Sequence, residues 1–251
     1  MLGNHEILLI LGHGSSKHPD SSQSVRSHAE LLAEKSNFAE VRVAFLKEEP
    51  FIDDCLKGID SDRVIIVPDF LAEGYFTRQV IPKKLGSIGR NENVIYCPPV
   101  GTHPMMASVI EDAAQQLLGD WLACQTELFV VGHGSGKNPC SKQTLLHHLE
   151  KIRALNTWAK VQDLWLEERP RVGDWQSLAK ARQIVVVPYL LNDGQHGGWD
   201  IPTDLGVKRG AVVHGVTHEM GDHRMRIARA AGSSPRFAEV IDLLASLWAS
   251  K

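Results

Sequence analysis

The 251-residue sequence predicts an α/β protein made of two tandem domains, each an open parallel sheet flanked by helices. Two observations predict this fold class. The chain repeats itself once, because 25 of 79 positions are identical between residues 8–86 and residues 128–206 without a gap. In both copies, short apolar segments rich in β-branched residues alternate with segments of helical spacing, which is typical of βαβ units. We therefore expect one domain over residues 1–120 and a second over residues 121–251.

Each copy contains segments short and apolar enough to be buried parallel strands. In the first copy the expected strands are residues 6–11, 41–46, 64–67 and 93–96. Its expected helices are residues 22–35 and 105–118, with weaker helical candidates at 53–60 and 79–85. The second copy repeats this order, with strands at 128–131, 161–166, 184–187 and 211–213 and helices at 142–155 and 235–248. In such sheets, ligands bind at the carboxyl ends of the strands.

Composition excludes several other classes of protein. The chain is 43% hydrophobic and 23% charged, which is sufficient for a core, and it has no apolar run of the roughly 18 residues that a membrane span needs. Its net charge of −3 gives no electrostatic reason to expect nucleic-acid binding. The four cysteines form no Cys-x-x-Cys pair, and the N-terminus does not resemble a signal peptide. We expect a cytoplasmic monomer without membrane or nucleic-acid partners.

Histidines follow the expected strands at positions where chemistry is favoured. His13 and His133 occupy the same motif, Gly-His-Gly-Ser, directly after the first strand of each copy. His196 lies in a glycine-rich loop after the third strand of the second copy, where the first copy has Phe76. Because the carboxyl ends of parallel strands meet at one edge, His133 and His196 are expected to converge. Two imidazoles there would form a divalent-metal or proton-transfer pair.

Acidic residues follow the second strand of the second copy. Glu167 and Glu168 stand where the first copy has Lys47 and Glu48. A carboxylate at this position would accept protons or bind the metal, and the sequence leaves open which of the two does so. A cation at Lys47 and an apolar ring at Phe76 both disfavour a metal site in the first copy. The second copy therefore holds the expected site, and the first is degenerate.

The two halves also differ in charge. Residues 1–120 carry 11 basic and 17 acidic residues, a balance of −6, whereas residues 121–251 carry 16 and 13, a balance of +3. A positive half suits an anionic substrate. Drift in surface charge explains the difference equally well.

The motifs of the second copy resemble those of a known family. They are the strand-Gly-His-Gly-Ser segment, Trp-Leu-Glu-Glu-Arg-Pro at 165–170, and Val-Pro-Tyr-Leu-Leu with His and Asp-Ile-Pro at 187–202. Together with Thr-His-Pro at 102–104 they resemble the class II chelatases, specifically the sirohydrochlorin cobaltochelatase and ferrochelatase (CbiX-type) family. The resemblance covers about 200 residues in two copies. It implies tandem flavodoxin-like domains and insertion of Co²⁺ or Fe²⁺ into sirohydrochlorin, for cobalamin or sirohaem synthesis, without ATP.

The resemblance also implies roles for particular residues. It places the family's two histidines on His133 and His196 and its carboxylate on Glu167, as metal ligands and catalytic groups. Glu168 is the alternative carboxylate, because this chain has three residues, where the family has four, between the aromatic-Leu pair and the proline. We expect the metal to be a substrate and no cofactor to be tightly bound. Substrate contacts are expected at four further positions: Gly134, Ser135, Leu191 and Trp199.

Two other functions are weighed against this one. A non-catalytic metal or tetrapyrrole carrier that keeps the fold is the alternative, because the first copy has decayed. A different histidine-based enzyme, such as a hydrolase, is disfavoured because no arginine precedes His13 or His133 and Gly-x-Ser-x-Gly is absent.

Several residues near these motifs have less defined roles. Asp200 is expected to be a partner of His196 or a helix cap. A second metal site among His214, His218 and His223 is a less favoured hypothesis. The adjacent pair His147 and His148 is expected on the surface.

Overall fold

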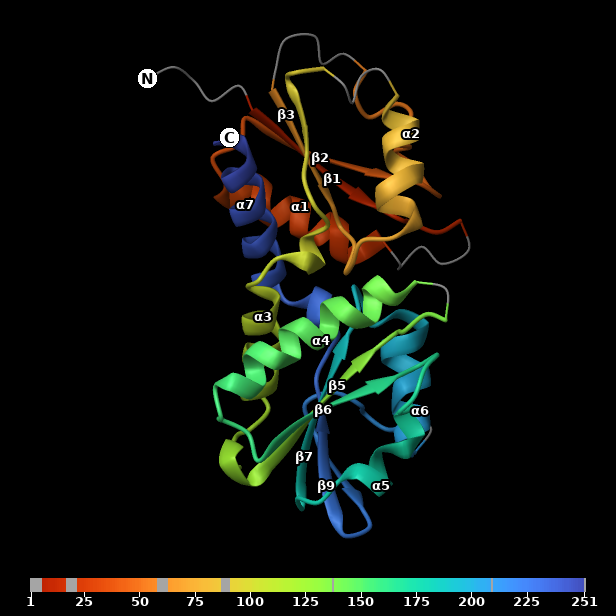
Figure 1. Cartoon of the computed structure of the whole chain (residues 1–251), viewed down its shortest axis with the longest axis vertical. Helices are drawn as coiled ribbons and strands as arrows, with labels where there is room; N and C mark the ends of the chain where they lie inside the picture. Colours follow the sequence, from red (N-terminus) through yellow and green to blue (C-terminus); the bar gives the residue numbers. More distant parts are fainter. Residues whose placement is uncertain are drawn as a thin grey trace. The chain divides into compact units, whose positions relative to one another are not determined.

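The computed structural model describes residues 6–16, 22–57, 63–86, 91–136, 138–208 and 210–250 (Figure 1). The chain divides into two compact units, each a mostly parallel sheet flanked by helices. Unit 1 comprises Met1–His103 and Pro235–Lys251, and unit 2 comprises Pro104–Ser234. This confirms the predicted α/β class.

Unit 1 has a four-stranded sheet in the order β2-β1-β3-β4, with every pair parallel. This order matches the first four strands of the flavodoxin-like sheet. The strands are β1 (Glu6–Gly12), β2 (Glu40–Phe45), β3 (Arg63–Pro68) and β4 (Val94–Tyr96). The helices are α1 (Gln23–Lys35), α2 (Ile81–Leu85), which continues a π-helical turn at Phe76–Val80, and α7 (Pro235–Ala249). Central strand β1 is buried from Ile7 onward, which explains its continuous apolar run.

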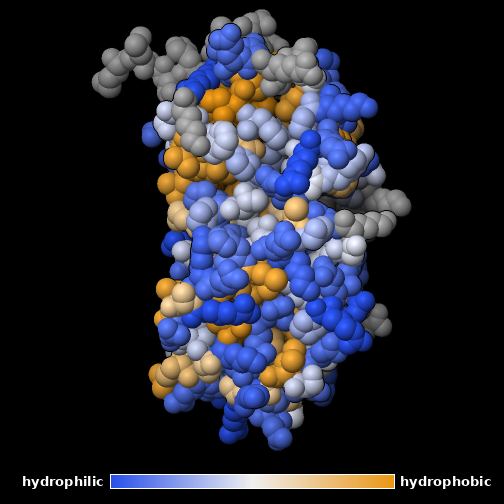
Figure 2. Space-filling model, viewed as in Figure 1, coloured by the Kyte–Doolittle hydropathy of each residue, from blue (hydrophilic) through white to orange (hydrophobic). Residues whose placement is uncertain are grey.

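Unit 2 has a five-stranded sheet in the order β6-β5-β7-β9-β8. The strands are β5 (Thr126–Gly132), β6 (Lys160–Trp165), β7 (Gln183–Tyr189), β8 (Thr217–Met220) and β9 (His223–Ile227). The helices are α3 (Met106–Gln115), α4 (Pro139–Ala154), α5 (Trp175–Leu178) and α6 (Ile201–Leu205), which continues a π-helical turn at His196–Asp200. Among the described helices, none has the length and apolarity to cross a membrane. On the face drawn in Figure 2, hydrophilic residues interrupt the hydrophobic ones.

The predicted fourth strand of the second copy, residues 211–213, is wrong. This segment is an irregular loop between Gly210 and Gly215, both with positive φ, and its Val212 is 70% exposed. Strand β9 takes the fourth position instead, and β8 pairs with it antiparallel. The side chains of Met225 and Ile227 on β9 are fully buried. The gapless repeat ends at Gly206. Beyond that residue the first copy no longer indicates where the fourth strand of the second copy lies.

The closing helices of the two copies are exchanged between the units. Helix α3, which ends the first sequence copy, packs against α4 and β7 in unit 2. Helix α7, which ends the second copy, packs against α1 and β3 in unit 1, and Figure 1 shows it beside α1. The structural division therefore differs from the expected boundary at residue 120, because each unit contains the closing helix of the other sequence copy.

Candidate active site

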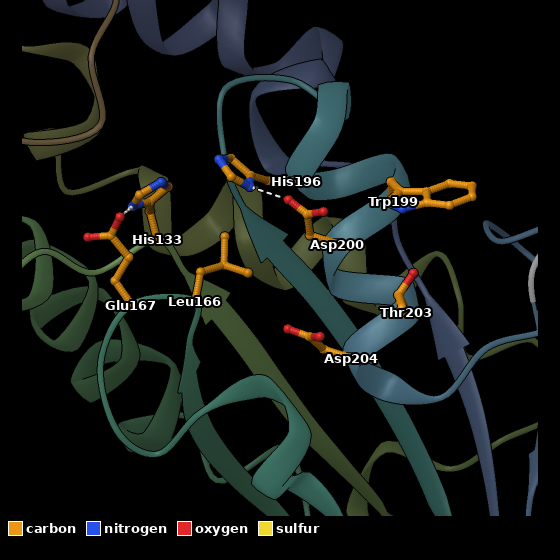
Figure 3. Close-up of a pocket in the computed structure, with 8 residues that line it drawn as sticks. All are labelled: His133, Leu166, Glu167, His196, Trp199, Asp200, Thr203 and Asp204. Atoms are coloured by element: carbon orange, nitrogen blue, oxygen red, sulfur yellow. Dashed lines mark hydrogen bonds and ion pairs between the residues drawn. The ribbon is translucent and has the colours of Figure 1, made fainter.

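The sequence-predicted histidines meet in a pocket of about 300 Å³ at the carboxyl edge of the unit 2 sheet (Figure 3). Its walls come from the ends of β5 and β6 and from the π-helical turn and α6 that follow β7. The lining residues are His133, Leu166, Glu167, His196, Trp199, Asp200, Thr203 and Asp204.

His133 is the first residue after β5, and the glycines on both sides of it fix its position. A Cβ on Gly132 would lie 2.4 Å from the Trp165 ring, so only glycine fits there. Gly134 has a φ of 74°, a backbone conformation that residues with a side chain rarely adopt. The Nδ1–H of His133 donates to the carbonyl of Gly134 at 2.9 Å. This hydrogen bond leaves Nε2 as the nitrogen with a free lone pair.

His196 begins the π-helical turn, and Asp200 fixes the orientation of its ring. Nδ1 of His196 lies 2.7 Å from Oδ2 of Asp200, so Nδ1–H is the donor and Nε2 is again available (Figure 3). The predicted partnership of Asp200 with His196 is confirmed. The His133 and His196 rings lie edge to face, with centroids 5.0 Å apart. A carboxylate behind an imidazole fixes the tautomer and the ring orientation of a metal-binding histidine.

Glu167 lies two residues after the end of β6, beside His133. Its backbone N–H donates to the carbonyl of His133 at 3.0 Å, which continues the β5–β6 ladder one step past the sheet. Its Oε1 lies 4.0 Å from Nδ1 of His133, and the side chain is 55% exposed. The carboxylate therefore faces the pocket and remains open to solvent and ligands.

Glu168 points to a different environment. It accepts the backbone N–H of Ser135 at 2.8 Å and the Lys142 ammonium at 3.2 Å. These interactions, led by the Ser135 hydrogen bond, lower the pKa of Glu168. In unit 1 the matching Glu48 accepts the N–H of Ser15 at 3.3 Å. Both copies therefore keep this glutamate to hold the Gly-His-Gly-Ser turn, whereas the position before it varies.

Replacing Glu168 by alanine is expected to destabilise the protein by about 1–3 kcal/mol at neutral pH, because the N–H of Ser135 loses its acceptor. The exposed Glu167→Ala is the matched control and should change the free energy of unfolding by less than about 0.5 kcal/mol. Because the pKa of Glu168 is lowered, its contribution is present above the usual glutamate range and is lost as the pH falls through the lowered value. Denaturant unfolding at pH 7 and pH 3 measures both effects. Equal stability of the two variants at pH 7 would contradict the assignment.

Unit 1 repeats this geometry without its chemistry. Nδ1 of His13 lies 2.8 Å from the carbonyl of Gly14, as in unit 2. Phe76 occupies the place of His196, with its ring centroid 4.8 Å from that of His13 and the rings edge to face. Lys47 stands where unit 2 has Glu167. Its backbone N–H donates to the carbonyl of His13 at 3.0 Å, as that of Glu167 does to His133. The imidazole and carboxylate partners are therefore replaced on an unchanged backbone.

Metal ligation in the pocket remains an expectation. Within the described residues, no three His, Cys, Asp or Glu side chains are already arranged to hold a metal ion. His133 and His196 offer two nitrogen donors, and Glu167 offers an oxygen donor nearby. So few protein donors leave coordination positions open, which suits a metal ion that is transferred to another molecule.

The expected substrate contacts are only partly brought together. Trp199 lines the pocket and is 42% exposed, whereas Gly134, Ser135 and Leu191 lie outside its lining. Sequence reasoning did not identify Leu166, Thr203 and Asp204. Thr203 and Asp204 lie on α6 within one turn of Asp200, so their helical spacing was the available signal.

Three further histidines of unit 2 bond the backbone. His214, His218 and His223 each bond a backbone carbonyl, of Ala228, Val213 and Ala181 respectively. Among the described residues they form no metal-binding group. The expected surface position is confirmed for His147 and wrong for His148, which is fully buried on the inner face of α4.

The fold and the paired-histidine pocket define the class, which is that of the chelatase-fold proteins. The chain is similar to DR2241 from Deinococcus radiodurans, described as a multi-domain protein with structural similarity to chelatases. Identity is 25% and the TM-score is 0.81, over 97% of this chain and 55% of that one. It shares its fold with the sirohydrochlorin chelatase SirB from Bacillus subtilis subspecies spizizenii, whose structure is a complex with cobalt. That match has 15% identity and a TM-score of 0.69, over 98% and 95% of the two chains.

The sequence comparisons identify the family within this class. The CbiX family model matches residues 7–117 and 127–245. A probable sirohydrochlorin cobaltochelatase from Halobacterium salinarum is 34% identical over 260 residues, covering 94% of this chain and 89% of the relative. The chain belongs to the CbiX family.

Proposed function

We propose that this protein inserts a divalent metal, Co²⁺ or Fe²⁺, into sirohydrochlorin, for cobalamin or sirohaem synthesis. The observation that carries the proposal is the pair His133 and His196, whose Nε2 atoms are both left available by hydrogen bonds at Nδ1. Family membership and the relatives named sirohydrochlorin cobaltochelatase support the substrate. We further propose that it acts as a cytoplasmic monomer, with the metal as substrate and no bound cofactor.

The arrangement suits the chemistry of metallation. Inserting a dication into a tetrapyrrole requires removal of two pyrrole protons. An imidazole Nε2 either binds the metal or accepts such a proton, and Asp200 stabilises the imidazolium that forms at His196. Glu167, open to solvent beside His133, provides an acceptor that passes protons to water. We propose Glu167 as the catalytic carboxylate, because both oxygens of Glu168 already have partners.

Metal insertion into sirohydrochlorin under anaerobic conditions, followed by absorbance, tests this function. The protein should accelerate insertion over the rate with metal alone, and His133→Ala should lower the rate by about 10²-fold or more. His13→Ala in unit 1 is the matched control and should keep the activity. Stoichiometric binding of sirohydrochlorin or metal without turnover would instead establish a carrier. Equal loss in both variants would contradict a site confined to unit 2.

A further inference from the structure

The loop that carries His196 is held differently from its counterpart in unit 1. In unit 1, the Thr77 hydroxyl bonds both backbone groups of Gly74, and the Tyr96 hydroxyl donates to the carbonyl of Thr77 at 2.8 Å. In unit 2, Gly197 and Gly198 replace Thr77 and Arg78, so the contacts of the Thr77 hydroxyl are lost. Glycine also gives this turn more backbone freedom than any other residue would.

Asp193 holds the unit 2 loop through contacts of its own. Its Oδ1 accepts the backbone N–H of Ala230 at 2.7 Å, which ties the loop to the segment after β9. Its own carbonyl accepts the N–H of Gly198, inside the π-helical turn, at 2.7 Å. Asp193 therefore bonds both the segment after β9 and the turn on which His196 lies.

Two cationic or ionisable side chains surround the Asp193 carboxylate. Nη1 of Arg229 lies 3.4 Å from Oδ2, and Nε2 of His214 lies 3.8 Å from Oδ1. The carboxylate is only 21% exposed, so it is partly shielded from solvent. At the matching position unit 1 has Glu73, which bonds the nearby Arg78 at the surface. The anchoring to the β9 segment is a feature of Asp193 in unit 2.

We propose that Asp193 is a positioning residue that fixes the direction of the His196 imidazole toward His133. This inference rests on the proposed function of the histidine pair. It also accounts for His214, which the sequence singled out and the pocket does not use. Removing a residue that hydrogen-bonds a metal-binding histidine typically lowers metal affinity by about 10–100-fold. Asp193 holds the turn and not the ring, so its loss should fall at the lower end of this range.

Binding of Co²⁺ alone to the full-length protein tests the proposal without the tetrapyrrole. The visible absorbance of bound Co²⁺ reports its ligands, and His196→Ala defines the part of the signal that depends on His196. Asp193→Ala is expected to weaken this binding by about 10-fold or more. Asp193→Asn keeps an acceptor for Ala230 but loses the charge facing Arg229 and His214, so it should fall between wild type and Asp193→Ala. Glu73→Gln is the matched control and should bind as wild type.

The metal-insertion assay separates positioning from simple destabilisation. Asp193→Asn should raise the KM for Co²⁺ and leave the KM for sirohydrochlorin unchanged. Wild-type affinity for Co²⁺ in both Asp193 variants would overturn the proposal. It would also be overturned if the absorbance of bound Co²⁺ were the same in the wild-type protein and in His196→Ala. If Asp193→Ala fails to fold, Asp193→Asn decides. Weakened Co²⁺ binding in a protein that never inserts metal would support positioning while refuting the proposed function.

Discussion

Replacing His196 by phenylalanine is expected to lower kcat/KM for metal insertion by about 10²- to 10⁴-fold without unfolding the protein. The substitution reproduces in unit 2 the ring that unit 1 already carries as Phe76. The geometry there shows that the fold accepts it, since the His13 and Phe76 centroids lie 4.8 Å apart and those of His133 and His196 lie 5.0 Å apart. Only the Nε2 lone pair and the bond to Asp200 are lost.

Steady-state rates and circular dichroism spectra measure this result. His13→Phe in unit 1 is the control, because it makes the same substitution at the unit 1 counterpart of His133, outside the pocket. It should keep both the activity and the fold. If His196→Phe retained more than about a tenth of the wild-type activity, His196 would not transfer protons or bind the metal in the reaction.

Replacing Asp69 by asparagine is expected to stabilise the protein increasingly as the pH rises above 4. Asp69 follows β3, is fully buried, and neither of its carboxylate oxygens has a hydrogen-bond partner in the described structure. Nδ1 of His28 lies 4.0 Å from its Oδ2. Burial raises the pKa of Asp69 from 3.8 to about 7. At the matching position unit 2 has Tyr189, which buries a neutral phenol instead.

The direction in which stability changes with pH follows from the raised pKa of Asp69. The folded state keeps a proton on Asp69 that the unfolded state releases near pH 4, so stability is present below pH 4 and is lost as the pH rises through 7. The loss is at most about 4 kcal/mol, from 1.36 kcal/mol per pKa unit. Asparagine keeps the shape without the charge and should remove this dependence. Denaturant unfolding from pH 4 to pH 9 measures it, with the exposed Glu30→Gln as control. Parallel pH profiles for wild type and Asp69→Asn would contradict the prediction.

Local sequence patterns predicted most of the fold. Strands such as β1 and β3 are continuous apolar runs, because both faces of a parallel sheet are covered. The pattern placed them to within about a residue or two. The segment 211–213 was misassigned because three apolar residues between glycines satisfy the strand pattern without being buried. The helix exchange could not be predicted, because α3 and α7 present similar apolar faces to equivalent partners in either unit.

The candidate site was predictable where the motif itself fixes the geometry. His133 follows a strand directly, and His196 lies in a loop at the same edge, so topology alone brings them together. Glu167 and Glu168 are adjacent, and neighbouring side chains at a strand end point in opposite directions. A one-residue difference in register would exchange their roles, so only the structure separates them. His28 and His148 occupy matching positions in the two copies and are both buried, although a surface position was expected for His148.

The exchange of α3 and α7 places the sequence repeat and the structural repeat out of phase by one helix. Unit 2 is in effect a circular permutation of the duplicated sequence, with its closing helix ahead of β5, where the duplicated order would put it after the last strand. Unit 2 is continuous from Pro104 to Ser234, whereas unit 1 lacks a helix until Pro235–Ala249 has been synthesised. Domains usually complete folding in the order in which the ribosome releases them. Here the unit that begins first is completed last.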